Sequence, residues 1–149
     1  MKSIDKKIGI LKERIRRLKA LEKTVPTFEK YQKLLNTKDI AERNLQVAIE
    51  ACLDISKIII SNSDLPEPED NKGVFRVLAE AGIIDEECLK FLIPMAGTRN
   101  ILVHGYDQID DAIVYGVLKK RLDDFELFLK NIVKNYIHKQ KEISQTDGK

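Results

Sequence analysis

An apolar residue recurs at every third or fourth position through the first twenty residues of the chain. The stripe is Ile4, Ile8, Leu11, Ile15 and Leu18, with successive gaps of 4, 3, 4 and 3 residues. This spacing places all five side chains on one face of an α-helix. A chain that opens this way must bury that face, and no later stretch alternates polar and apolar residues as a strand does. We therefore predict an all-α fold, an antiparallel bundle of about five helices.

Later segments repeat the helical pattern between residues that oppose helix. Pro26 suits the first residue of a short helix, and Thr37 suits the N-cap of a central helix over 38–61. Pro, Asn and Asp residues predict a loop over 62–71. A short helix is expected over 74–81, ended by Gly82, and another after the cap Asp85, with a bend or break at Pro94. A last helix is expected from Asp110 or Asp111 onward, with apolar positions as far as Val133.

The length of 149 residues, 43% of them hydrophobic, allows one domain with a real core. We assign residues 1–137 to a single helical domain and residues 138–149 to a polar, flexible C-terminal tail. Cys52 and Cys88 lie within apolar helical patterns, so we expect buried free thiols. There is no signal-peptide pattern and no apolar run of about 20 residues, which predicts a cytoplasmic protein without a membrane span.

Positive charge is concentrated at the start of the chain. Residues 1–33 contain eleven Lys and Arg against four acids, although the whole chain carries a net charge of only +2. A basic segment of this kind attracts phosphates. The alternative is a solvated helix face with no binding role, which is the commoner case for charge runs.

A positively charged side chain interrupts the apolar stripe of the helix after Asp85. Arg99 lies four residues after Met95 and three before Leu102, among apolar positions. Burying an unpaired guanidinium is costly, so we expect Arg99 to face a partner side chain, a ligand or a second subunit. Asn100 and His104 are four residues apart and share a helix face.

The end of this helix brings together groups suited to RNA cleavage. Gly105 is expected to end the helix, which puts His104 in the last turn and Tyr106 just beyond it. An imidazole can transfer protons at the 2′-hydroxyl or the leaving oxygen, and Arg99 can stabilise charge on the phosphate. The 2′-hydroxyl is a built-in nucleophile, so neither a metal nor another cofactor is expected. On spacing alone, however, one Arg and one His on a helix are more often structural than catalytic.

The pattern R-x4-H-x-Y formed by Arg99, His104 and Tyr106 resembles the motif of HepT-like toxins in the HEPN superfamily. Asn100 matches the asparagine that commonly follows the arginine in that family. The segments 43–55 and 75–85 resemble two further conserved blocks of the family, in the same order. The resemblance therefore covers about residues 40–130.

The resemblance implies an endoribonuclease that is the toxin of a toxin–antitoxin system. Members of this family are helical homodimers in which two copies of the motif form one RNA-cleaving cleft. Arg99 and His104 would be the catalytic pair, with Asn100 as a positioning residue. The partner would be a minimal nucleotidyltransferase (MNT) antitoxin, which in related pairs transfers AMP to the motif tyrosine, here Tyr106. That bulky anionic group would block the cleft.

Two acidic residues on the central helix are candidates for a supporting role. Glu50 and Asp54 are four residues apart, and either could pair with Arg99 or orient His104. The alternative is a surface or interhelical salt bridge with no part in chemistry.

Two other functions stay open at this point. One is a non-catalytic HEPN module that binds a nucleotide or associates with a nucleotidyltransferase. The other is a purely structural bundle, which predicts that Arg99 and His104 lie far from any cleft.

Overall fold

The computed structural model describes residues 2–147; the side chains of Lys2, Tyr106 and residues 144–147 lie outside the description. Within this range the prediction of an all-α fold is confirmed, because the described residues contain no strand. In chain order the elements are α1 (Lys2–Glu22), α2 (Phe28–Lys33), α3 (Leu35–Asn62), α4 (Asn71–Glu80), α5 (Glu86–His104), a 3₁₀ turn η1 (Tyr106–Gln108), α6 (Asp111–Lys120), α7 (Leu122–Ile132), a π-helical turn η2 (Val133–Ile137) and α8 (His138–Asp147).

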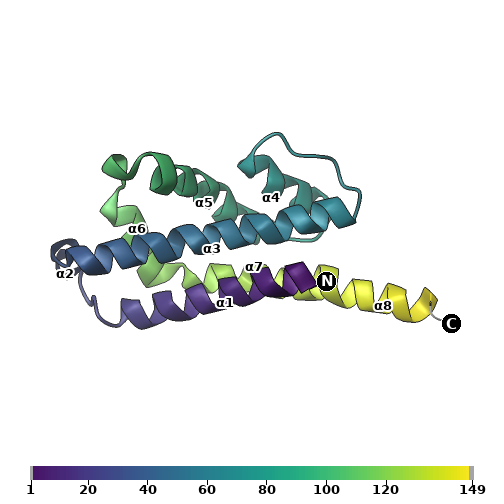
Figure 1. Cartoon of the computed structure of the whole chain (residues 1–149), viewed down its shortest axis with the longest axis horizontal. Helices are drawn as coiled ribbons and strands as arrows, with labels where there is room; N and C mark the ends of the chain where they lie inside the picture. The colour runs from purple at the N-terminus through teal and green to yellow at the C-terminus, as the bar shows by residue number, and fades with distance from the viewer. Residues whose placement is uncertain (1, 148–149) are drawn as a thin grey trace.

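Helix α3 runs through the middle of the bundle and contacts α1, α2, α4, α5 and α6. Figure 1 shows α1 and α7 on one side of α3, and α4 and α5 on the other. Helices α1 and α3 are antiparallel, since Lys7 pairs with Asp54 while Arg14 bonds to Asn44. The central position predicted for this helix is therefore confirmed.

The core is built from the apolar faces that the periodicity predicts. All five members of the α1 stripe are buried, and Phe91 of α5 packs edge-to-face on Phe125 of α7 with ring centroids 5.0 Å apart. Cys52 and Cys88 are buried free thiols, as predicted. Burial raises the pKa of the Cys88 thiol to about 12 and that of Cys52 well above its usual value, so neither is a thiolate near neutral pH.

Aspartates start three of the helices. The side chains of Asp70, Asp85 and Asp110 each accept a hydrogen bond from a backbone N–H of the first turn. Asp85 was predicted as a cap, and Asp110 is one of the two residues predicted to start the last helix. Gly82 follows the end of α4 with a φ of +75°, a left-handed conformation that favours glycine, as expected of the residue that ends this helix.

Two predicted helix starts are wrong. The short helix begins at Phe28 rather than at Pro26, because Thr27 is its cap and accepts from the backbone N–H of Lys30. The central helix begins at Leu35, so Thr37 lies inside its first turn instead of capping it. The reason is that Leu34 serves both helices: its N–H bonds to Lys30 and its carbonyl accepts from Lys38.

Two other details of the later helices bear on the sequence-based expectation. Helix α5 continues through Pro94 without a break, one of the two outcomes expected there, and the predicted last helix is interrupted at Arg121 although no proline or glycine stands there. The segment expected to be a tail forms α8, which extends beyond the other helices at one end in Figure 1. The domain boundary at residue 137 and the flexibility of the tail stay predictions. Among the described residues, no helix has the length and apolarity needed to cross a membrane.

Candidate functional site

Helix α5 presents the motif residues and is fixed at both ends. At its start, Asp85 accepts from the Cys88 N–H at 2.8 Å, and the Asp85 N–H donates to the buried amide of Asn131 on α7 at 2.9 Å. At its end, the Gly105 N–H donates to the Ile101 carbonyl at 2.8 Å. Gly105 is the C-cap, as the sequence predicts, so His104 is the last helical residue.

Arg99 lies at the contact between α5 and α3. Its side chain is 24% exposed, and its Nη2 lies 3.1 Å from Oε2 of Glu50. Its Nη1 donates to Oδ1 of Asn100 at 3.3 Å, and its buried Nε has no acceptor among the described residues. A guanidinium carries five N–H donors, so both Nη atoms keep a further N–H for another acceptor. The expectation that Arg99 faces a charged partner is met by Glu50.

The two candidate acids of α3 have different partners. Glu50 is bonded to Arg99 and also accepts from the Gln46 amide at 3.3 Å, so its carboxylate is held on both sides. Asp54 pairs instead with Lys7 of α1 at 3.1 Å. Neither acid contacts His104 within the described part of the chain. The geometry thus brings Glu50, and not Asp54, to the motif arginine.

His104 and Asn100 are both exposed on α5, and their spacing places them on one face of the helix. Arg99 is five residues from His104, which turns the two side chains toward different sides of the helix. Ile101 lies between them in sequence and is 41% exposed. Tyr106 begins the 3₁₀ turn that follows, but its side chain lies outside the described residues, so its expected place beside His104 stays a prediction.

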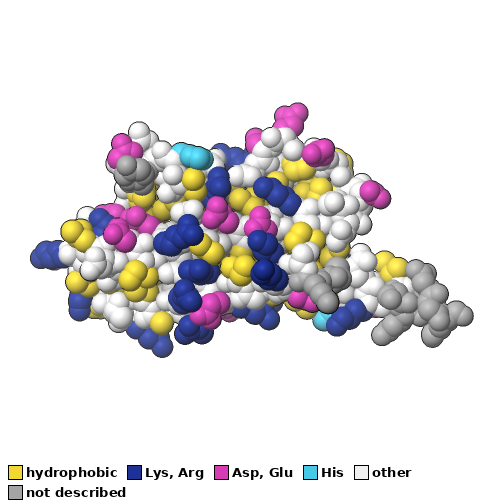
Figure 2. Space-filling model, in the orientation of Figure 1, with side chains coloured by type: hydrophobic (Ala, Val, Ile, Leu, Met, Phe, Trp, Pro, Cys, Tyr) yellow, Lys and Arg dark blue, Asp and Glu magenta, His cyan; other side chains and the backbone are white. Residues whose placement is uncertain are grey.

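A groove of about 400 Å³ lies beside Arg99. Figure 2 shows Lys and Arg side chains mixed with Asp and Glu across the middle of the molecule, over α1 and α3. Sequence reasoning did not single out Arg43 or Lys57 as functional residues. Their spacing could have indicated them, since both lie seven residues from Glu50 and therefore on the same face of the helix. The groove is lined by Lys7, Ile10, Arg43, Val47, Glu50, Ala51, Leu53, Asp54, Lys57, Asn71 and Arg99.

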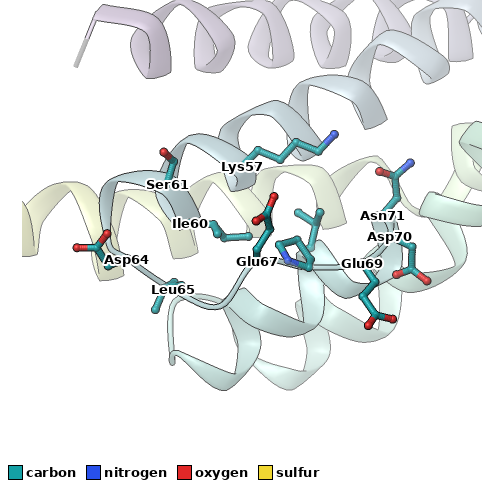
Figure 3. A pocket seen from close by; sticks show the side chains of 11 residues that line it. Lys57, Ile60, Ser61, Asp64, Leu65, Glu67, Glu69, Asp70 and Asn71 are labelled. Carbon is teal, nitrogen blue, oxygen red and sulfur yellow. The ribbon is translucent and has the colours of Figure 1, made fainter.

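A second, larger pocket of about 620 Å³ lies between α3, α4 and the loop that joins them. Figure 3 shows acidic side chains from this loop in the lining of the pocket, among them Asp64, Glu67 and Glu69. Arg99 and His104 do not line it. Over residues 2–147, no group of three or more His, Cys, Asp or Glu side chains is placed to hold a metal ion.

This architecture defines the class of the chain: an all-α bundle whose fifth helix carries a half-buried arginine and ends in an exposed histidine. Residues 11–132 match the family model described as Ribonuclease HepT-like. The chain therefore belongs to the HepT-like ribonuclease family of HEPN toxins, and at that level the prediction of a ribonuclease is confirmed.

Two relatives are similar in sequence. The mRNA nuclease HepT of Shewanella oneidensis is 31% identical over 123 residues, which cover 83% of this chain and 90% of that protein. The tRNA nuclease HepT of Aphanizomenon flos-aquae is 33% identical over 93 residues, 62% of this chain and 63% of that protein.

Solved structures agree with this assignment. A chain from a toxin–antitoxin crystal structure with AMP-PNP has a TM-score of 0.81 and 30% identity, over 89% of this chain and 98% of that one. The tri-AMPylated HEPN toxin of Shewanella oneidensis, in complex with its MNT antitoxin, has a TM-score of 0.78 and 31% identity. The match covers 87% of this chain and 95% of that one. The Bacillus subtilis protein YutE, at 19% identity and a TM-score of 0.78, shares the fold.

Proposed function

We propose that this chain is the toxin of a toxin–antitoxin pair, a cytoplasmic endoribonuclease that cleaves RNA with Arg99 and His104 and without a metal. The observation that carries the proposal is the exposed His104 at the end of the helix whose Arg99 is held by Glu50. The imidazole is free to meet a substrate, while the guanidinium is fixed in place before the substrate arrives. Preorganised charge of this kind is what phosphoryl transfer requires.

The roles follow from the chemistry of RNA. His104 takes the proton of the 2′-hydroxyl or returns one to the leaving 5′-oxygen. The free N–H groups of Arg99 stabilise the charge that grows on the non-bridging phosphate oxygens. Asn100 shares the His104 face and is bonded to Arg99, so it links the two catalytic side chains as a positioning residue.

We further propose that two copies of the chain join along α5. Arg99 and His104 point to different sides of one helix, so a second copy is needed to complete a cleft around one phosphate. The 41% exposure of Ile101 between Asn100 and Leu102 supports an apolar contact there.

Inhibition is proposed to act at Tyr106, two residues after His104. The Shewanella oneidensis relative is described as tri-AMPylated and bound to an MNT antitoxin. Transfer of AMP from ATP to the Tyr106 hydroxyl, with release of pyrophosphate, would add a bulky anion beside the cationic site. We expect mass spectrometry after incubation with ATP and the cognate MNT protein to find added AMP on the wild type and none on Tyr106→Phe. AMP found on the Tyr106→Phe protein would show that a residue other than Tyr106 is modified.

The catalytic assignment is tested by cleavage of RNA in the presence of a chelator. Because the two relatives are named for mRNA and tRNA, both substrates should be offered. We expect Arg99→Ala and His104→Ala to lose about 10²–10⁴-fold in rate, the usual contribution of such groups. His138→Ala is the matched control, since this other histidine is exposed on α8. Equal activity in all four proteins would refute the assignment, and no cleavage by any of them would favour the non-catalytic module.

A further inference from the structure

The groove beside Arg99 carries charges that neither the catalytic proposal nor the fold explains. Its volume is about 400 Å³, within the range of ligand-binding clefts, and its wall comes from α1, α3, α4 and α5. Apolar side chains of Ile10, Val47 and Leu53 lie among the charged ones.

The acidic side chains in the groove are already neutralised. Glu50 is paired with Arg99 and Asp54 with Lys7, each at 3.1 Å. Arg43 and Lys57 are exposed and have no acidic partner among the side chains that the structure describes. The groove therefore keeps two uncompensated positive charges, which attract an anion into a concave surface.

The spacing of these charges indicates what kind of anion fits. Arg43, Glu50 and Lys57 are seven residues apart on α3, so all three lie on one helix face at intervals of about 10.5 Å. Because Glu50 contacts Arg99, the motif arginine stands at the midpoint between the two unpaired cations. A single small anion cannot reach cations about 21 Å apart. A linear polyanion can contact both.

The groove has a defined end. Lys57 and Asn71 line both the groove and the larger pocket of Figure 3, where the Lys57 side chain extends toward the side on which Asn71 lies. Beyond Lys57 the lining of that pocket includes Asp64, Glu67 and Glu69. These carboxylates repel phosphates, so a polyanion lying in the groove would leave the surface near Lys57.

We propose that the groove binds the sugar–phosphate backbone of one RNA strand on both sides of the phosphate held by Arg99, with Arg43 and Lys57 as the flanking contacts. This inference rests on the proposed ribonuclease function and deepens it. It also gives part of the basic N-terminal segment a role, because Lys7 neutralises Asp54 and so keeps the groove positive.

The test measures binding separately from cleavage. The background is His104→Ala, which removes the proposed proton-transfer group, and the probe is a fluorescein-labelled single-stranded RNA of 20 nucleotides, followed by anisotropy over a range of salt concentrations. We expect Arg43→Gln with Lys57→Gln to weaken binding by about tenfold or more. The slope of log K against log salt should fall by about 1.4, because each lost phosphate contact on a single strand contributes about 0.7.

Lys130→Gln with Lys134→Gln is the matched control. It removes the same charge from two exposed lysines of α7 and η2 that do not line the groove. Equal losses in the two double variants would reduce the effect to net charge and overturn the inference. Sedimentation velocity tests whether a second copy of the chain occupies the groove instead of RNA. If the groove variant changes its oligomeric state and loses RNA affinity for that reason alone, the groove is an interface between copies and the inference fails.

The two proposals fail in different ways. If the wild type cleaves no RNA but the groove variants still lose binding selectively, the ribonuclease function is wrong and the RNA-binding groove stands. If the wild type cleaves RNA and the groove variants bind it as the control does, the function stands and the groove is unrelated to RNA.

Discussion

At the scale of single residues, the pair of Arg99 and Glu50 determines how the motif is presented. Their side chains are 24% and 33% exposed, so the ion pair is only partly screened from water. An ion pair of this exposure contributes about 1 kcal/mol or less to folding. Its larger effect is on orientation, because Glu50 is itself fixed by Gln46 and holds the guanidinium in one place.

We therefore expect Glu50→Gln to act on turnover more than on substrate binding. The amide keeps a hydrogen bond to Arg99 but loses the charge that fixes the guanidinium, so kcat should fall by roughly tenfold while KM changes little. Glu50→Asp should recover part of the loss. Asp54→Gln is the control for charge, since it removes one negative charge from the same groove but from an acid that pairs with Lys7 rather than with the motif. Steady-state cleavage kinetics give the comparison, and an equal loss in Asp54→Gln would argue against a specific role of Glu50.

The sequence predicts the identity of the motif residues but not their surroundings. Arg99 is conspicuous because a charge interrupts an apolar stripe, and its need for a partner follows from the cost of burial. Which acid is the partner depends on the rotation of α3 against α5, since Glu50 and Asp54 are one turn apart and equally plausible by spacing. Arg43 and Lys57 look like ordinary surface charges until α1 forms the opposite wall of the groove.

At the scale of elements, the start of α5 is fixed by one side chain. Asp85 accepts from the Cys88 N–H, and its negative charge also suits the positive end of the helix dipole. We expect Asp85→Ala to lower the free energy of unfolding by about 1 kcal/mol. Urea denaturation followed by circular dichroism measures this, with Glu86→Ala as a control because Glu86 is not the cap. A loss equally large in Glu86→Ala would mean that the dipole matters and the cap does not.

The first turns of α3 contain an electrostatic conflict. Burial, and then the nearby carboxylates of Asp111 and Asp39, raise the pKa of Glu42, against a smaller opposing effect of Lys38. A raised carboxyl pKa means that the folded chain binds the proton more tightly than the unfolded chain. Ionised Glu42 therefore destabilises the fold. This cost to the free energy of unfolding is absent at low pH and develops as the pH rises through the folded-state pKa of Glu42.

Replacing this carboxylate should consequently stabilise the fold at neutral pH. We expect Glu42→Gln to raise Tm at pH 7 and to leave it nearly unchanged near pH 3, where Glu42 is protonated in both states. Thermal unfolding at both pH values measures the difference. Asp39→Asn is a useful comparison, because it relieves Glu42 only indirectly. A Tm gain of the same size at both pH values would show that the effect is not electrostatic.

Periodicity predicts which elements exist better than it predicts where they begin. The α1 stripe, the cap Asp85, the helix start at Asp110 or Asp111 and the loop after α3 are local signals, and the structure confirms them. The sequence does not predict the junction of α2 and α3, because Leu34 caps both helices through backbone hydrogen bonds. Such bonds leave no side-chain pattern in the sequence. The interruption at Arg121 likewise has no helix-breaking residue.

At the scale of the whole molecule, one face of the motif helix is not covered by the residues that the structure describes. Pro94, Asn100, Ile101 and His104 are all exposed on α5, although the opposite side of the helix is buried against α3 and α7. Ile101 adds an exposed apolar side chain to this face, between the polar motif residues. The proposed second copy would cover Ile101 and bring a second motif to the same cleft in one step.

Ile101→Asp should therefore give a folded but monomeric and inactive protein. The carboxylate adds no clash within the chain, because the Ile101 side chain is already 41% exposed, so the thermal unfolding curve should keep its shape and shift by no more than a few degrees. At the proposed interface the same carboxylate would be buried without a partner, and the cost of desolvating an unpaired charge prevents association. Sedimentation equilibrium should show half the mass of the wild type. RNA cleavage should fall at least about 10²-fold, because no composite cleft forms. Leu35→Asp is the matched control: Leu35 is 66% exposed at the start of α3, on another helix than the motif, and its substitution should alter neither mass nor cleavage. A monomeric Ile101→Asp protein that still cleaves RNA at the wild-type rate would place the whole site within one chain.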